Sequence, residues 1–106
     1  MRRGEVWWAN LPEPWGRRPV LLLARDQAYD LLTYVIAAPL TTRIRSLPTA
    51  VQLAPGVDRV PDLCIVNLDA IQVVHTGWLD RFIVRLGPER MEQVDRAIHF
   101  ALDLRS

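Results

Sequence analysis

The sequence has little of what marks several classes of protein. Its only cysteine, Cys64, cannot form an internal disulfide, and its place in an apolar run predicts a small buried side chain. No apolar run approaches the ~18 residues that a membrane-spanning helix needs. Arg2 and Arg3 are followed by Gly4 and Glu5, and not by the apolar segment of a signal peptide. We therefore expect a cytoplasmic protein that makes no contact with a membrane.

The sequence also lacks a large excess of either charge, and it has no lysine. It contains 13 basic residues, all arginine, and 12 acidic residues, so the formal net charge is +1. Composition alone therefore does not indicate a nucleic-acid-binding protein. The charge is nevertheless uneven. Residues 1–59 hold eight arginines and five acids, a balance of +3, whereas residues 60–106 hold five arginines and seven acids, a balance of −2. This distribution is compatible with a phosphate-facing surface built from the first half of the chain.

No spacing of histidine, cysteine and carboxylate residues resembles a metal site, so we expect neither a metal nor another cofactor. His75 follows an apolar run and His99 adjoins the apolar face of a predicted helix, and both are interpreted as structural. A length of 106 residues predicts a single domain over residues 1–106. Half of the residues are hydrophobic and four are tryptophan, which is more apolar surface than one small monomer readily hides. An oligomer interface would use the surplus.

The chain alternates short apolar runs with proline, glycine and polar residues, which is typical of short strands. Strands are predicted over Val6–Leu11, Pro19–Ala24, Tyr34–Leu40, Thr49–Leu53, Leu63–Asp69, Ile71–Val74 and Phe82–Leu86. No strong break separates the predicted strands Leu63–Asp69 and Ile71–Val74, so a bend or bulge is expected between them, near Ala70. One helical turn is predicted within Arg25–Leu32, with Asp26 as its cap.

The final segment changes to a helical period. Gly87 and Pro88 favour a helix start, and apolar residues then recur three or four positions apart. Five to seven short strands followed by one C-terminal helix predict a mainly β fold. Its simplest form is a small, strongly bent antiparallel barrel with the helix packed alongside.

Five segments, read in order, resemble the MazF/PemK/Kid family of toxins. They are Arg3–Leu11 (RGEVWWANL), Arg18–Val20 (RPV), Val35–Thr42 (VIAAPLTT), Cys64–Val74 (CIVNLDAIQVV) and Glu89–Leu102 (ERMEQVDRAIHFAL). None is specific alone, but their order and spacing cover nearly the whole chain. The resemblance implies a barrel similar to the SH3 and CcdB folds, assembled as a homodimer. It also implies sequence-specific, metal-independent cleavage of single-stranded RNA to 2′,3′-cyclic phosphate and 5′-hydroxyl ends, and a cognate antitoxin whose extended, often acidic tail covers the RNA groove.

Three residues match the family's active-site positions. Arg18, before Pro19, matches the catalytic arginine, and a guanidinium is a donor fork suited to phosphate oxygens. Thr41 matches the active-site threonine at the end of the third strand. Asp69 lies where the Kid branch has a carboxylate that is a possible base, although Asn67 replaces an arginine of that branch. Each also has a structural interpretation: a surface arginine, a strand-ending threonine and a turn former.

Further residues are expected to contact RNA. Arg43 and Arg45 follow the threonine and could track phosphates or simply be solvated. Trp15 could stack on a base or pack against the protein. Asn67 shares a strand face with Ile65 and Asp69. The remaining candidates are Arg17, next to Arg18, and Thr42, next to Thr41.

Two alternatives remain open at this stage. A CcdB-like gyrase-binding toxin would use an aromatic and hydrophobic C-terminal plug, which Leu102–Ser106 poorly provides. A catalytically weak dimeric barrel that binds an antitoxin is the other. The loop PEPWGRRP, shorter than the family's usual glycine-rich insertion, and the missing second cation keep this alternative open.

Overall fold

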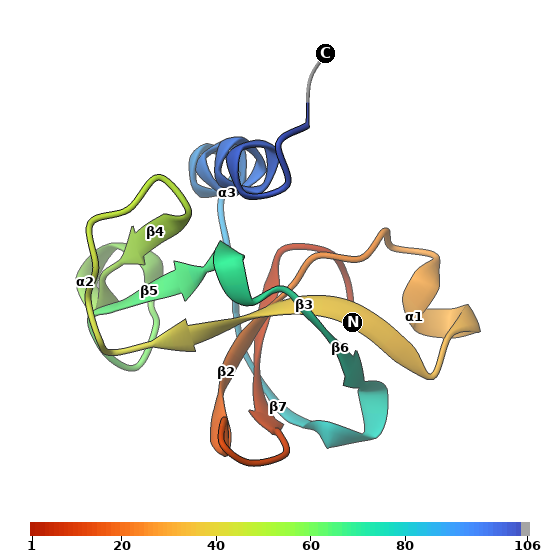
Figure 1. Ribbon diagram of the computed structural model, residues 1–106. Helices are drawn as coiled ribbons and strands as arrows, with labels where there is room; N and C mark the ends of the chain where they lie inside the picture. Colours follow the sequence, from red (N-terminus) through yellow and green to blue (C-terminus); the bar gives the residue numbers. More distant parts are fainter. Residues whose placement is uncertain (105–106) are drawn as a thin grey trace.

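A computed structural model describes residues 1–104 of the chain; Arg105 and Ser106, the end of the segment considered above as a plug, lie outside this description. Its strands are β1 (Glu5–Asn10), β2 (Arg17–Leu22), β3 (Tyr34–Thr41), β4 (Ala50–Leu53), β5 (Cys64–Asn67), β6 (Gln72–His75) and β7 (Leu79–Arg85). The helices are α1 (Ala28–Leu31), α2 (Pro55–Asp58) and α3 (Pro88–Ala101), with 3₁₀ turns η1 (Leu68–Ala70) and η2 (Thr76–Trp78) (Figure 1). The mainly β architecture with a C-terminal helix is therefore confirmed.

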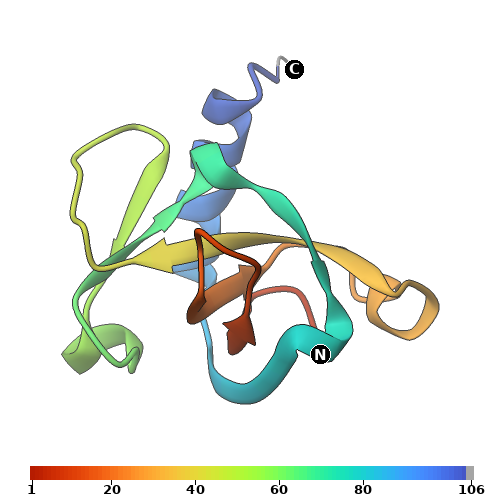
Figure 2. The same cartoon turned by 60° about the horizontal axis from the view of Figure 1, so that its bottom comes forward.

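All strand pairs are antiparallel, in the order β4-β5-β3-β2-β1-β7, with β6 also paired to β3. The long strand β3 crosses the molecule (Figures 1 and 2) and pairs with β2 along one edge. Its other edge is shared, because β6 pairs with Tyr34–Ala37 and β5 with Leu40 and Thr41. Turn η1 redirects the chain between these two strands. The bend expected near Ala70 is confirmed.

The expected small, strongly bent antiparallel barrel is present as a bent antiparallel sheet, which within residues 1–104 does not close on itself. Strands β4 and β7 end the order without pairing to each other. Helix α3 packs beside β4 (Figure 1), and its buried residues Val94 and Ala97 share a cluster with Val51 and Leu53 of β4. The open side of the sheet is thus stabilised by apolar helix packing as well as by strand pairing.

The core lies on both faces of the sheet. Strand β2 shows why, since Leu21 belongs to the cluster under α3 whereas Val20 and Leu22 belong to a second cluster on the opposite side. A continuous apolar run is expected for a strand buried on both faces. Cys64 is 5% exposed and lies in the first cluster, as predicted.

Some local predictions need correction. Asp26 does not cap α1, which begins after Gln27 without a side-chain cap; its carboxylate instead accepts the backbone N–H of Arg3 at 2.8 Å. The segment between the predicted strands Thr49–Leu53 and Leu63–Asp69, for which no helix was predicted, contains α2. Within it the buried carboxylate of Asp58 accepts hydrogen bonds from the Ala54 N–H and the Arg90 Nε, both at 2.9 Å. These bonds fasten α2 to α3.

Among the described residues, no helix is long and apolar enough to cross a membrane.

Candidate active site

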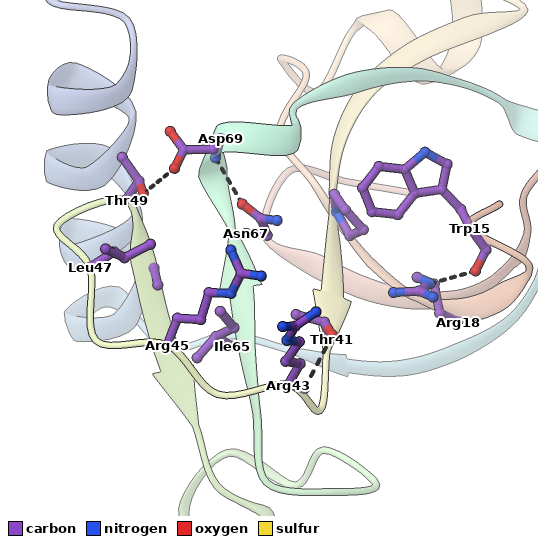
Figure 3. Close-up of a pocket in the computed structure, with 12 residues that line it drawn as sticks. Trp15, Arg18, Thr41, Arg43, Arg45, Leu47, Thr49, Ile65, Asn67 and Asp69 are labelled. Atoms are coloured by element: carbon purple, nitrogen blue, oxygen red, sulfur yellow. Dashed lines mark hydrogen bonds between the residues drawn. The ribbon is translucent and has the colours of Figure 1, made fainter.

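A cavity of about 280 Å³ lies between the β1–β2 loop, the end of β3 and the turn after β5 (Figure 3). Its lining residues are Trp15, Arg18, Pro39, Thr41, Arg43, Arg45, Leu47, Thr49, Ala50, Ile65, Asn67 and Asp69. Seven of the nine site residues predicted from the sequence are in this set. The volume is slightly below the roughly 300–1,000 Å³ of most ligand pockets, and the site is open to solvent.

Strand register brings Arg18 and Thr41 together. In the β2–β3 pair Val20 lies opposite Pro39, and Pro39 lines the cavity. Arg18 lies two residues before Val20 and Thr41 lies two residues after Pro39, so in this antiparallel pair alternation places both on the same face as Val20 and Pro39. The structure thus brings together the two residues that match the family's arginine and threonine, and both line the cavity.

Arg18 is held by the loop that precedes it. Its Nε donates to the backbone carbonyl of Trp15 at 2.7 Å, and its guanidinium carbon lies 5.5 Å from the centroid of the Trp15 ring. Within residues 1–104 no carboxylate pairs with it. The two terminal nitrogens therefore remain available as donors. Trp15 itself is half-buried against the second core cluster, so it combines the packing interpretation with a place in the cavity wall.

The loop after β3 adds further donors. Thr41 is half-buried, and its Oγ1 accepts the backbone N–H of Arg43 at 3.2 Å. This bond leaves the hydroxyl proton of Thr41 free to donate. Arg43 and Arg45 are exposed, and in the described part of the chain neither has a carboxylate partner. Three guanidinium groups without an ion pair thus line one cavity, which is the surface that a phosphodiester chain requires.

Polar groups of a different kind lie at the other end. Asn67 Oδ1 accepts the backbone N–H of Asp69 at 3.1 Å, and Asp69 Oδ2 accepts the Thr49 hydroxyl at 2.6 Å. Figure 3 shows the Asp69 carboxylate turned towards Thr49, at the opposite end of the cavity from Arg18 and Trp15. Ile65, Asn67 and Asp69 share the cavity face as predicted, although β5 ends at Asn67 and Asp69 belongs to η1.

Sequence reasoning did not identify Thr49. It was placed in an outer strand, but its partner Asp69 lies 20 residues away. Their proximity depends on the pairing of Ala50 with Asn67 across β4 and β5. A threonine that begins a strand carries no local signal of such a partner.

Arg17 and Thr42 lie outside the cavity, so the structure does not bring these two predicted RNA contacts together with the other seven. Strand alternation turns Arg17 to the opposite face of β2 from Arg18. There its Nη1 donates to Asp80 and Asn10, and its guanidinium lies 5.1 Å from the Trp8 ring centroid. The hydrogen bond from Arg17 lowers the pKa of Asp80 below its usual value. Thr42 is exposed and lines a separate, small depression.

Metal-ligating side chains do not gather at the cavity. In the part of the chain that the structure describes, no three histidine, cysteine or acidic side chains are close enough to share a metal ion. His75 accepts the backbone N–H of Gly77 through Nδ1 at 2.8 Å, which is the structural role expected of it. His99 is exposed on α3.

Residues 2–102 match the family described as PemK-like, MazF-like toxin of type II toxin–antitoxin system. The chain belongs to this family. A probable endoribonuclease MazF5 from Mycobacterium tuberculosis is 43% identical to this MazF-like toxin over 101 residues, which cover 95% of the chain and 92% of the relative. A second relative from the same species, a probable endoribonuclease MazF2, is 40% identical over 93 residues, covering 88% of the chain and 89% of the relative.

Solved structures agree with this assignment. The structure of the Mycobacterium tuberculosis toxin MazF-mt6 superposes on the present chain with a TM-score of 0.86. The two sequences are 31% identical, and the superposition covers 96% of this chain and 99% of MazF-mt6. A mycobacterial endoribonuclease in complex with its cognate antitoxin superposes with a TM-score of 0.87 at 26% identity, covering 100% and 98%. The open, bent sheet is therefore the fold of MazF toxins.

Proposed function

We propose that this MazF-like toxin is an endoribonuclease that cuts single-stranded RNA at specific sequences, without a metal or other cofactor, leaving 2′,3′-cyclic phosphate and 5′-hydroxyl ends. The observation that carries the proposal is the convergence of the Arg18 guanidinium and the Thr41 hydroxyl on one open cavity. Relatives of nearly the same length are named endoribonucleases. The whole chain, residues 1–106, is proposed to act as one toxin domain in the cytoplasm.

Arg18 and Thr41 have complementary roles in this proposal. As the ribose 2′-oxygen attacks phosphorus, negative charge grows on the phosphate oxygens, and the free nitrogens of Arg18 donate to them. The bond to the Trp15 carbonyl fixes the guanidinium before substrate arrives, so little reorganisation is needed. The Thr41 hydroxyl donates to a phosphate oxygen or aligns the 2′-hydroxyl. Arg43 and Arg45 bind neighbouring phosphates.

Asp69 is left out of this catalytic assignment. The sequence-based hypothesis gave it a catalytic role, possibly as a base, but its carboxylate is at the end of the cavity away from Arg18 (Figure 3). One of its oxygens is also engaged by Thr49. A proton acceptor for the 2′-hydroxyl has to lie within hydrogen-bond reach of the same phosphodiester that Arg18 contacts.

Two partners complete the proposed function. The first is a cognate antitoxin, which is supported by the family description and by the antitoxin bound to a structural relative. The second is another copy of the chain. Ile36 of β3 pairs directly with Val73 of β6, and the two side chains are 48% and 61% exposed. Tyr34, 52% exposed, extends the same apolar face and supports a homodimer contact there.

The test of the catalytic proposal uses two adjacent arginines. Purified protein is incubated with end-labelled mixed-sequence RNA in EDTA, and the product ends are identified chemically. Arg18→Ala is expected to slow cleavage by about 10²–10³-fold, because a preorganised donor to the developing charge is lost. Arg17→Ala, which removes a guanidinium outside the cavity, is expected to cleave like the wild-type chain.

Circular dichroism establishes that both variants are folded. Wild-type protein that binds gyrase, or only an antitoxin, and leaves RNA intact would contradict the enzymatic proposal. Full activity in Arg18→Ala would contradict the assignment of this residue.

A further inference from the structure

We propose that Thr49, Asn67 and Asp69 form a subsite that reads one base of the RNA by accepting a hydrogen bond from its exocyclic amino group. The inference rests on the proposed ribonuclease function and gives it a specificity determinant. In this proposal the two ends of the cavity bind different parts of the RNA. Arg18 and Thr41 bind the phosphodiester, and Asp69 binds a base at the other end (Figure 3).

Asp69 is the only acidic residue among the twelve that line the cavity. A carboxylate repels phosphates, so Asp69 weakens RNA binding in this cavity unless it accepts a hydrogen bond from the RNA. A carboxylate that accepts from the right base and repels the wrong one provides discrimination in exchange for affinity. In protein–nucleic acid contacts, carboxylates typically accept from the amino group of cytosine.

The carboxylate is held rigidly. Thr49 is 6% exposed, and its hydroxyl donates to Asp69 Oδ2 at 2.6 Å, the short distance of a charge-assisted hydrogen bond. The Thr49 carbonyl accepts the N–H of Leu68 at 2.9 Å, and the Asp69 N–H donates to Asn67 at 3.1 Å. Both ends of the Thr49–Asp69 bond are therefore fixed by backbone contacts.

Two polar groups remain for a ligand. Within residues 1–104 no protein group donates to Asp69 Oδ1. The Asn67 amide is oriented by accepting through Oδ1, so its NH₂ group remains as a donor, and it has no acceptor among the described side chains. An acceptor beside a donor complements an exocyclic amino group beside a ring nitrogen or carbonyl.

The neighbouring residues suit a nucleotide. Ile65, 3% exposed, and Leu47, 46% exposed, add apolar surface to the cavity wall. Arg45 lines the same cavity as Asn67, so its guanidinium can bind the phosphate of the nucleotide being read (Figure 3).

The subsite discriminates against uracil. Uracil has no exocyclic amino group, and its ring donor, the N3–H, lies between two carbonyl oxygens. The Asn67 amide can donate to one of them, but the other is brought towards the charge of Asp69. Adenine, cytosine and guanine each offer an exocyclic amino group to Oδ1. We therefore expect one position of the cleavage sequence to exclude uracil.

Mapping of cut sites tests this inference. A long RNA of mixed sequence is digested with the wild-type chain, Asp69→Asn, Thr49→Val, Thr49→Ser and Arg18→Ala, and all 5′-hydroxyl ends are sequenced. Asp69→Asn is expected to keep cleaving but to accept uracil at one position, because the new amide can donate to a uracil carbonyl. The preference against uracil there should fall roughly 5- to 100-fold, which corresponds to one lost base contact.

Thr49→Val should relax the same position, since the carboxylate is no longer held, and Thr49→Ser should retain the wild-type preference. Asp30→Asn, the same substitution at an exposed site on α1, is the matched control and should leave the cleavage sequence unchanged. Circular dichroism again establishes folding.

The outcomes are distinguishable. If Asp69→Asn stops cleavage at all sites, as Arg18→Ala should, the carboxylate is catalytic and the subsite inference is overturned. An unchanged cleavage sequence in an active Asp69→Asn variant overturns it as well. Wild-type protein that cuts no RNA removes the proposed function itself.

Discussion

Cys64 shows how strongly a single position can depend on its surroundings. The thiol is buried at the start of β5, close to the carboxylates of Asp58 and Asp62. Burial first, and then these two negative charges, raise its pKa from 9.0 to about 11. Only the thiolate reacts with alkylating reagents, so the structure predicts an unreactive cysteine at neutral pH.

The raised pKa makes stability depend on alkaline pH. In the unfolded chain the thiol ionises near pH 9.0, whereas in the folded chain it stays protonated up to about pH 11. Unfolding thus releases a proton in this window, and the free energy of unfolding should fall as pH rises from 9 to 11. Urea unfolding at several pH values measures this slope, and Cys64→Ala should have a shallower one.

Iodoacetamide provides an independent check of the same prediction. At pH 8 the native thiol should react about one hundred times more slowly than the thiol of the urea-unfolded chain. Equal rates in the two states would contradict it.

The positions of the site residues in the fold could be predicted from the sequence to different degrees. Arg18 and Thr41 precede or end apolar strands, and alternation along a strand indicates which face each occupies. Arg17 and Thr42 are their immediate neighbours, and without the strand boundaries the sequence could not assign them to the opposite face. Thr49 was not predictable, because its role depends on a partner in another strand. Non-local register of this kind has no signature within a short window.

At the scale of elements, the short β1–β2 loop positions Arg18, the arginine proposed to be catalytic. Gly16 has a φ of +65°, in the left-handed region that other residues adopt at a cost. Its carbonyl accepts the N–H of Leu11 at 3.1 Å, and the Trp15 N–H donates to Pro12 at 3.0 Å. These bonds fix the Trp15 carbonyl that holds Arg18. A longer insertion, as is usual in the family, is not needed for this purpose.

Gly16→Ala should therefore affect both stability and cleavage. An added Cβ would meet nothing closer than a Glu13 oxygen at 3.9 Å, so the cost comes from backbone strain alone, about 1–2 kcal/mol. For a domain of this size, each kcal/mol lowers Tm by about 4–8 °C. Cleavage should slow because the loop relaxes and releases Arg18.

Gly56→Ala is the matched control. It lies in α2, and nothing lies within 4 Å of an added Cβ. Thermal unfolding and the RNA assay of both variants decide the outcome. A Gly16→Ala variant as stable and active as Gly56→Ala would contradict the role of the loop.

The positions of the strands and of the C-terminal helix could be predicted from the sequence more closely than the pairing of the strands. Runs of apolar residues marked all seven strands, and Gly87 with Pro88 marked the start of α3 correctly. The short helix α2 was missed, because Pro55–Asp58 looks like a turn and its stability comes from the bond of Asp58 to Ala54 and from Arg90 on a distant helix. The bent antiparallel barrel was expected from the number of short strands, but a strand count does not reveal that β4 and β7 end the sheet without pairing to each other.

At the scale of the whole molecule, the apolar face of β3 and β6 predicts association. Val73→Glu should shift the protein from dimer to monomer, because a charge in an apolar contact is not solvated there. Light scattering over a range of concentrations measures the change. Val57→Glu is the control, since Val57 is 75% exposed on α2, away from that face. A Val73→Glu variant that stays dimeric would place the contact elsewhere.

The cavity joins side chains from the β1–β2 loop to η1, and its Asn67 and Asp69 end depends on β5, which pairs with β3 and β4. A ribosome that is still synthesising the first half of this toxin therefore holds a polypeptide whose Arg18 and Thr41 lack the wall that β5 supplies. We therefore expect an unfinished chain to leave the messenger being translated uncut. RNA cleavage is expected only from chains that have emerged far enough from the ribosome for β5 to pair with β3 and β4.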